Sequence, residues 1–445
     1  MAYLSNSDKD FAEMLHTIGV DRFEDLIENI PREIRFSGAF NLPEAESELG
    51  VSNVVGELAD ENRTFVSFLG GGAYDHYVPA VVNALISRPE FYTSYTPYQP
   101  EVSQGNLQAM YEFQSMVCEL TGMDVTNASM YEGGSALAEA VLLGAQQTRK
   151  NKILFASTIN RRYREVVETY TANMGFQLIT MPRAGFTVNT GELESLYDDQ
   201  TGVFVVQHPN YFGFLEDMEA ISAFCRDKNL ILIEVYDPIS LGILKTPGDY
   251  AAHIAIAEGQ SLGNAQNFGG PYVGLFSATE KLVRKMPGRL SGMTVDSEGR
   301  RGFVLTLQTR EQHIRREKAT SNICTNSGLM ALAAGIYLAL LGKQGLQKVA
   351  DLCLQKAHYL ADRLCAIEGV SLASNAPYFK EFTLKLPVPA KSVIDYAMKK
   401  GLLPGIDLSG EGYPDHLLVA VTEKRTRQEL DALAETVGEA VRLVR

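Results

Sequence analysis

Six short apolar runs, several of them separated by segments of helical length, constrain the fold of this chain more than any other feature. The runs cover residues 153–156, 178–181, 203–206, 230–235, 254–257 and 273–276. Helical periodicity marks the intervening segments 132–149, 163–174 and 215–228. Near-continuous apolar strands that alternate with helices indicate a mainly parallel sheet covered on both faces. The sequence therefore predicts an α/β fold.

A chain of 445 residues exceeds one ordinary domain and predicts more than one lobe. We expect an N-terminal helical arm over residues 1–64, a large α/β domain over 65–320, and linking helices with a small C-terminal α/β domain over 321–445. The arm has an apolar stripe that must dock on another surface. The apolar run 328–341 is too short to span a bilayer and is expected to form a buried helix.

Composition excludes several classes of partner. A formal net charge of −14 and a pI near 5.1 argue against binding to nucleic acid or to an anionic membrane. The five cysteines contain no C-x-x-C pair, so we expect reduced thiols, no disulfide framework and no metal site. The N-terminal segment has neither a secretory nor a transit signal, which predicts a cytoplasmic protein.

The run at 230–235 is followed by Asp237-Pro238, at the edge where parallel sheets bind ligands. An aspartate at this edge can pair with the pyridinium nitrogen of pyridoxal phosphate, and such an enzyme also needs a Schiff-base lysine. No lysine occurs between Lys245 and Lys281. Asp237 as an ordinary turn residue therefore remains an alternative.

The segment Gly133-Gly134-Ser135 opens one of the predicted helices. The free N–H groups of a helix N-terminus form a ready anion site. Many helices begin in this way without a ligand, so this pattern alone does not decide between the two readings.

Two further segments carry polar chemistry without core character. Residues 91–104 interleave aromatic side chains with Pro97 and Pro100, which predicts a stiff loop, either packed or lining a ligand. Residues 305–326 concentrate cations with almost no apolar stripe. Either a solvated helix or an interface wall that faces carboxylates fits this second pattern.

Five motifs, read together, resemble the P-protein family of the glycine cleavage system, the decarboxylating glycine dehydrogenases. They are YTPYQPE at 95–101 with SQG at 103–105, QHPNYFG at 207–213, Asp237-Pro238 with Leu241-Gly242, GQSLG at 259–263 and QTREQHIRREK at 308–318. The resemblance runs essentially end to end, but only to the N-terminal half of the single-chain form, and thus to the alpha subunit (subunit 1) of the split form. It implies the pyridoxal phosphate fold type I, with an aspartate aminotransferase-like large domain and a smaller C-terminal domain.

The resemblance also implies where the cofactor is held. In this family the pyridoxal phosphate lysine belongs to the other half, and Gln260 falls near the lysine position in this chain. Glutamine cannot form an imine, so the resemblance implies a cofactor held by the partner, subunit 2 (beta), in an α2β2 assembly. A vestigial cofactor cup would then consist of Gly133, Gly134, Ser135 and Asp237.

The activity implied by the resemblance is decarboxylation of glycine, with transfer of the aminomethyl group to the lipoyl arm of the H-protein. No catalytic residue of this chain is expected to be self-sufficient. The expected contributors across the interface are Tyr95, Tyr98, Glu101, His313 and Arg315. Two alternatives stay open: a stand-alone pyridoxal phosphate decarboxylase or aminotransferase that uses another lysine, and a non-catalytic assembly subunit.

Overall fold

The computed structural model describes residues 5–36 and 38–444, in two compact units. The first unit ends at Arg63 and the second begins at Thr64. Helices of the first unit are α1 (Asp8–Ile18), α2 (Phe23–Leu26), the 3-10 turn η1 (Arg32–Ile34) and α3 (Glu48–Asp60). Leu15 is the single buried residue among the described residues of this unit. The unit therefore has almost no core of its own.

A seven-stranded sheet forms the centre of the second unit, with the order β2-β10-β9-β8-β7-β3-β4. Strands β9, β8, β7, β3 and β4 pair in parallel, and β10 is antiparallel to both of its neighbours. The mainly parallel α/β sheet predicted from the sequence is confirmed. Its strands are β2 (Val125–Thr126), β3 (Lys152–Ala156), β4 (Gln177–Met181), β7 (Thr201–His208), β8 (Ile231–Tyr236), β9 (Ile254–Glu258) and β10 (Gly274–Ala278).

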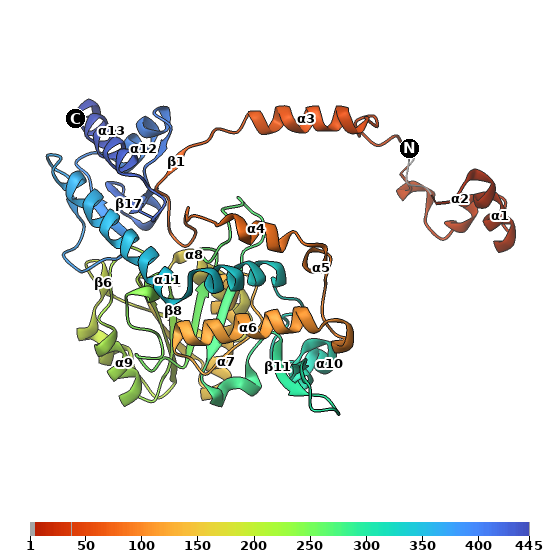
Figure 1. The fold of residues 1–445 in the computed structure, drawn as a ribbon, viewed down its shortest axis with the longest axis horizontal. Helices are drawn as coiled ribbons and strands as arrows, with labels where there is room; N and C mark the ends of the chain where they lie inside the picture. The colour runs from red at the N-terminus through yellow and green to blue at the C-terminus, as the bar shows by residue number, and fades with distance from the viewer. Residues whose placement is uncertain (1–4, 37, 445) are drawn as a thin grey trace. The chain divides into compact units, whose positions relative to one another are not determined.

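Both faces of this sheet are buried, as the unbroken apolar strands require. Along β9, Ile254 and Ile256 belong to one core cluster, whereas Ala255 and Ala257 belong to another. The first cluster includes residues of α7, α8 and α9, and the second includes residues of α4, α6 and α11 (Figure 1). These helices are α4 (Ala80–Ile86), α6 (Gln104–Thr121), α7 (Gly133–Thr148), α8 (Arg161–Thr171), α9 (Met218–Asp227) and α11 (Gly328–Cys365).

Helix α11 connects the large sheet to the C-terminal sheet. It breaks at Gly342, where φ is 57° and ψ is −173°, a conformation that glycine adopts most readily. The part before the break packs in the core around α6, and the part after Ala357 packs in the C-terminal core. By length and composition alone α11 would suffice to cross a membrane, but much of it is packed inside this unit.

A smaller antiparallel sheet, with the order β13-β14-β17-β16, forms the C-terminal part of the second unit. Helices α12 and α13 pack on it (Figure 1). Its elements are β13 (Ser371–Leu372), β14 (Glu381–Lys385), β16 (Ile406–Asp407), β17 (His416–Ala420), α12 (Ala390–Lys399) and α13 (Arg427–Val444). Strand β1 (Val66–Ser67) pairs in parallel with β15 (Leu402–Leu403), which brings residues 68–77 to this sheet.

Two sequence interpretations need correction. The predicted loop 91–104 begins inside the short helix α5 (Pro89–Tyr92) and contains a 3-10 turn, η2 (Pro100–Val102). The solvated helix considered for 305–326 is wrong, since Leu307 and Arg316 take left-handed φ values of 52° and 54° that interrupt any helix. This segment follows the hairpin β11 (Leu290–Val295) and β12 (Arg301–Thr306) as three single turns, η6 (Gln308–Arg310), α10 (Gln312–Arg315) and η7 (Arg316–Lys318).

The remaining described elements are short. They comprise β5 (Arg183–Ala184), β6 (Thr187–Val188), η3 (Thr190–Leu196), η4 (Ser240–Gly242), η5 (Glu280–Lys285) and η8 (Ser409–Glu411).

Candidate functional site

The vestigial cup predicted from the sequence lies at the carboxyl edge of the parallel sheet. Asp237 directly follows β8, and its Oδ1 accepts a hydrogen bond from the Ile239 N–H at 2.9 Å. A cavity of about 30 Å³ opens here, enough for about two water molecules. Its lining comprises Gly72, Tyr74, Asn160, Tyr163, Gln207, Pro209, Val235, Tyr236, Asp237, Pro238, Glu258, Phe379, Lys380 and Glu381.

Lys380, which precedes β14 of the C-terminal sheet, extends into this cup. Its Nζ lies 2.6 Å from Asp237 Oδ2 and 3.1 Å from His76 Nε2. The same ammonium lies 3.5 Å from the centroid of the Tyr74 ring, which adds a cation–π contact. Lys380 is almost completely buried, so its charge is held by these three groups.

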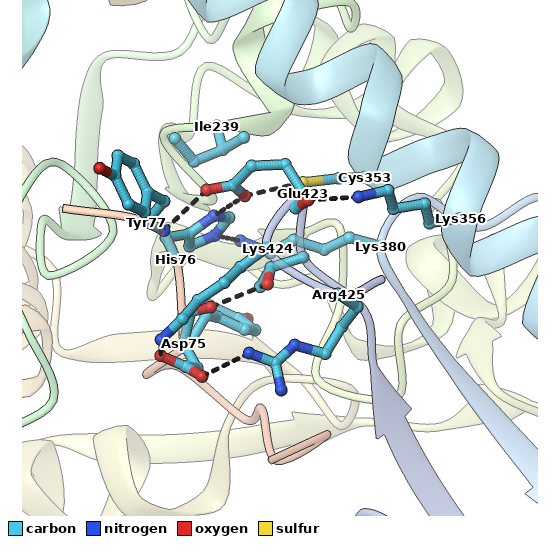
Figure 2. A network of polar contacts seen from close by, with 12 residues as sticks. Asp75, His76, Tyr77, Ile239, Cys353, Lys356, Lys380, Glu423, Lys424 and Arg425 are labelled. Atoms are coloured by element: carbon cyan, nitrogen blue, oxygen red, sulfur yellow. Dashed lines mark hydrogen bonds and ion pairs between the residues drawn. The ribbon is translucent and has the colours of Figure 1, made fainter. Parts of the chain in front are cut away.

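His76 continues the network toward α11 (Figure 2). Burial and the neighbouring Lys380 ammonium lower the pKa of His76, so we assign a neutral ring. We place the ring proton on Nδ1, which donates to Glu423 Oε2 at 2.6 Å, while Nε2 accepts a hydrogen bond from Lys380. Glu423 also accepts from the Tyr77 N–H at 2.8 Å and from the Cys353 thiol at 3.5 Å.

The side chains of His76, Cys353 and Glu423 place three potential metal-ligand atoms within 4.8 Å of one another. Protons account for this grouping without a metal, because each of the three atoms takes part in the hydrogen bonds just described. The Lys380 ammonium beside the ring also opposes binding of a divalent cation. We therefore read the group as part of the polar network.

The helix N-terminus at Gly133, Gly134 and Ser135 is filled by carboxylates of the chain itself. Glu132 caps α7 and accepts from the Gly134 N–H and, at 2.6 Å, from the Ser135 N–H. Glu258 Oε2 accepts from the Gly133 N–H at 3.1 Å. A Cβ at residue 133 would lie 2.7 Å from the Tyr163 hydroxyl, so this position requires glycine. The N–H groups that could hold an anion already have acceptors.

Gln260, which the family resemblance places near the cofactor lysine, is buried and fully hydrogen-bonded. Its Oε1 accepts from the Tyr74 N–H at 2.8 Å. Its Nε2 donates to the Tyr74 carbonyl at 3.1 Å and to the Asn264 carbonyl at 2.7 Å. The amide thus ties two segments of backbone together beside the cup.

Two acids at this edge are shifted toward their neutral forms. Burial raises the pKa of Glu258 to about 8, although hydrogen bonds from backbone N–H groups to its carboxyl lower this pKa. Burial likewise raises the pKa of Glu381 to about 7; its carboxyl accepts from the Gly71 N–H and the Tyr74 hydroxyl, each at 2.7 Å. Shifts of this kind are common at functional sites and in buried polar networks alike.

A second group of polar residues forms around Tyr98 and His313, two of the contributors predicted from the sequence. Their rings meet edge to face with centroids 5.4 Å apart. Arg289 Nη2 donates to the Tyr98 hydroxyl at 3.1 Å, and Arg289 Nε lies 3.7 Å from Glu311 Oε2. His313 Nδ1 lies 3.5 Å from the same carboxylate oxygen. We call Tyr98, Arg289, Glu311 and His313 the arginine cluster.

The arginine cluster contains polar atoms with unmet hydrogen-bonding capacity. Within the described part of the chain, Arg289 Nε and Glu311 Oε1 have no hydrogen-bond partner, although both residues are buried. The neighbouring Arg310 is also buried and donates through Nη1 to the Met286 carbonyl, but its Nε and Nη2 lack partners. Buried polar atoms are rarely left unpaired, which indicates bridging waters or further groups at this place.

The other three predicted contributors lie at the surface. Tyr95 is 80% exposed and, together with Tyr92, Pro97 and Met110, lines a separate cavity of about 150 Å³ between α6 and α11. Glu101 is exposed in η2, and Arg315 is exposed at the end of α10. The structure thus brings Tyr98 and His313 together but leaves Tyr95, Glu101 and Arg315 outside the arginine cluster.

Several residues of the cup and of the arginine cluster were not predicted from the sequence. Lys380, His76 and Glu423 come from segments far from Asp237 in the chain, and no local pattern links them. Arg289 precedes the hairpin and has no motif of its own. A signal did exist for Glu132, because an acidic residue directly before a helix start is a favourable cap.

Comparisons with known proteins agree over nearly the whole chain. Residues 1–437 match the family described as "Glycine cleavage system P-protein". A relative from Chloroherpeton thalassium, named "Probable glycine dehydrogenase (decarboxylating) subunit 1", is 50% identical over 442 residues, which cover 99% of this chain and 100% of the relative.

Among solved structures, the glycine decarboxylase (P-protein) of the glycine cleavage system in inhibitor-bound form is similar with a TM-score of 0.92. It is 42% identical and covers 99% of this chain and 100% of its own. A glutamate decarboxylase from Lactobacillus brevis reaches a TM-score of 0.71 at 12% identity, covering 93% of this chain and 96% of its own. The second likeness concerns the fold alone, and it agrees with the fold type expected from the sequence.

Proposed function

Because this chain belongs to the glycine cleavage system P-protein family, we propose that it is the alpha subunit of a decarboxylating glycine dehydrogenase that acts with a second subunit. The second subunit, in this proposal, carries the pyridoxal phosphate lysine, in an α2β2 assembly. The observation that carries this division of labour is Gln260, whose buried amide is used by backbone groups beside the cup. A soluble, cytoplasmic complex fits the composition of the chain.

The cofactor of such an enzyme supplies the electron sink that makes loss of carbon dioxide from glycine possible. This chain contributes side chains that surround the reacting groups. We propose that the arginine cluster and the exposed Tyr95 face the partner's site. The His313 ring and the Tyr98 hydroxyl can each hold or pass a proton, and Arg289 fixes the position of that hydroxyl.

The aminomethyl group is then transferred, in this proposal, to the lipoyl arm of the H-protein. That step needs an open entrance on the surface. Tyr95, Glu101 and Arg315 support this role because they are exposed and polar, and because Tyr95 borders a surface cavity. Their exposure also suits them to contact the partner subunit or the H-protein.

Reconstitution tests the proposal. The chain is mixed with the lysine-bearing subunit and pyridoxal phosphate, and exchange of labelled carbon dioxide into glycine is measured. We expect exchange only when both subunits are present. Exchange by the second subunit alone at the same rate, or by this chain alone, would contradict the proposal.

Two variants distinguish a contribution to turnover from a role in subunit assembly alone. Tyr95→Phe and Arg315→Ala are expected to lower turnover about 10-fold at saturating subunit, with assembly intact. An assembly subunit without a part in the chemistry would instead show changes in subunit affinity that disappear at saturation. Tyr77→Phe, an exposed tyrosine on another segment, serves as the matched control.

A further inference from the structure

The cup at Asp237 does not fit pyridoxal phosphate. The cofactor requires a lysine for its aldehyde, a carboxylate for its ring nitrogen and free N–H groups for its phosphate. Here Gln260 has no imine-forming nitrogen, Asp237 is already paired with Lys380, and the N–H groups of Gly133 to Ser135 have acceptors within the chain. The remaining cavity of about 30 Å³ is too small for a ring with a phosphate arm.

Charge opposes the phosphate even if the cavity opened. Glu132 stands at the helix N-terminus where the phosphate would bind, and the buried Glu258, which is shifted toward its neutral form, already accepts a hydrogen bond from the Gly133 N–H. Glu132 caps the N–H groups of Gly134 and Ser135, so an incoming dianion would have to displace a carboxylate and then lie beside it. The phosphate and the Glu132 carboxylate, both negative and adjacent, would repel each other.

We propose that Lys380 replaces the cofactor as the cation of this cup and that it locks the C-terminal sheet onto the large sheet. The ammonium is placed 2.6 Å from the carboxylate that would otherwise bind a ring nitrogen. Lys380 comes from the C-terminal sheet, whereas Asp237 belongs to the edge of the large sheet, so the pair joins both parts of the second unit. His76 and the Tyr74 face hold the ammonium from the other directions.

Lys380 is placed wrongly to be a Schiff-base lysine. In the pyridine ring the aldehyde-bearing carbon lies opposite the ring nitrogen. A lysine nitrogen in contact with the carboxylate that would hold the ring nitrogen therefore stands at the wrong end of the ring to reach the aldehyde. This geometry weakens the stand-alone enzyme reading, because Lys380 is the lysine that lines the cup.

The lock is independent of the function proposed above, since it concerns charges within this chain only. Removing one member of a buried ion pair leaves the other uncompensated, whereas removing both relieves that penalty. The prediction is therefore a strong coupling between the two positions. A lysine that merely fills space would show none.

A double-mutant cycle on thermal unfolding of the full chain tests the lock. Lys380→Met is expected to lower Tm by on the order of 5 °C or more, and Asp237→Asn by a similar amount. The double variant should lose clearly less in Tm than the sum of the two single losses. Lys385→Met, at the exposed end of β14, is the matched control and should leave Tm unchanged. Equal effects of Lys380→Met and Lys385→Met, or additive losses in the double variant, would overturn the lock.

A binding experiment tests the misfit without relying on enzymatic activity. The wild-type chain is incubated with pyridoxal phosphate, reduced with borohydride and mapped by peptide mass. We expect no labelling of Lys380, whereas a labelled Lys380 would refute its role as the cofactor's substitute. Should Lys380→Met fail to fold, Asp237→Asn with and without the second substitution still reports the coupling.

Discussion

Arg289 joins Tyr98 to Glu311. Its Nη2 donates to the Tyr98 hydroxyl at 3.1 Å, and its Nε lies 3.7 Å from Glu311 Oε2, with both charged side chains almost fully buried. A buried arginine that pairs with a single carboxylate among the described residues is strongly dependent on that carboxylate. The arginine cluster therefore combines a structural ion pair with two rings that can take part in proton transfer.

Loss of Arg289 should destabilise the chain more than loss of an exposed arginine in the hairpin that follows it. Arg289→Met leaves the Glu311 carboxylate buried without its partner, and we expect a loss of about 3 kcal/mol in the free energy of unfolding. Urea unfolding measures it. Arg300→Met, in the exposed turn between β11 and β12, is the control and should change less than about 0.5 kcal/mol. Similar losses in both variants would contradict a buried pair.

The raised pKa of Glu258 predicts a pH dependence of stability. Burial raises this pKa from the ordinary 4.5 to about 8, so the folded chain keeps a proton that the unfolded chain releases between these two values. Stability should therefore fall as the pH rises from about 5 to 8, by on the order of 1 kcal/mol per pH unit from this group. Other groups titrate in the same range, so the comparison with a variant isolates Glu258.

Glu258→Gln imitates the protonated acid, and its unfolding free energy should show a flatter pH profile than the wild type. Urea unfolding at pH 6 and pH 8 gives the difference between the two proteins. A profile identical to that of the wild type would mean that Glu258 is ionised in the folded chain throughout this range. The exposed Glu435→Gln on α13 serves as the control, because its profile should match the wild type.

Gln260→Lys alone should not create a cofactor site. The substitution removes the acceptor of the Tyr74 N–H, and we expect a loss of about 1–3 kcal/mol in the free energy of unfolding. Because Lys380 and the carboxylates at α7 remain, added pyridoxal phosphate should give no imine absorbance. Ala265→Lys, at an exposed position of the same loop, is the control for the added charge. An imine formed by Gln260→Lys would show that the cup is still open.

The first unit is predicted to contribute to binding of the partner subunit. Leu42 and Leu49 are 74% and 72% exposed, too much apolar surface to leave unpaired in an assembled enzyme. Leu42→Glu with Leu49→Glu should weaken association with the second subunit about 10-fold or more. Isothermal titration measures the affinity. Leu443→Glu, 70% exposed on α13, is the control, and equal weakening by it would contradict a specific role of the first unit.

Six of the seven strands of the sheet could be predicted from sequence because each carries a local apolar run, whereas the two-residue strand β2 carries none. Residues 254–257 carry an unbroken apolar run, and in the structure their side chains alternate between two cores. The contact between Lys380 and Asp237 could not be predicted, because it depends on how two separate sheets meet. The turns at 307 and 316 were equally hidden, since neither Leu307 nor Arg316 is a residue type that marks a left-handed conformation. Gln260 was placed near the lysine position by resemblance, and its hydrogen bonds with Tyr74 became visible only in the structure.

The carboxylate cap on α7 has a consequence for how such an enzyme is put together. Glu132 supplies from within the polypeptide the negative charge that this helix start requires. With Lys380 supplying the opposite charge next to Asp237, the cup has its balancing charges within the chain. Under the division of labour proposed above, the folding of this subunit would not depend on the supply of vitamin B6, whereas loading of the second subunit would.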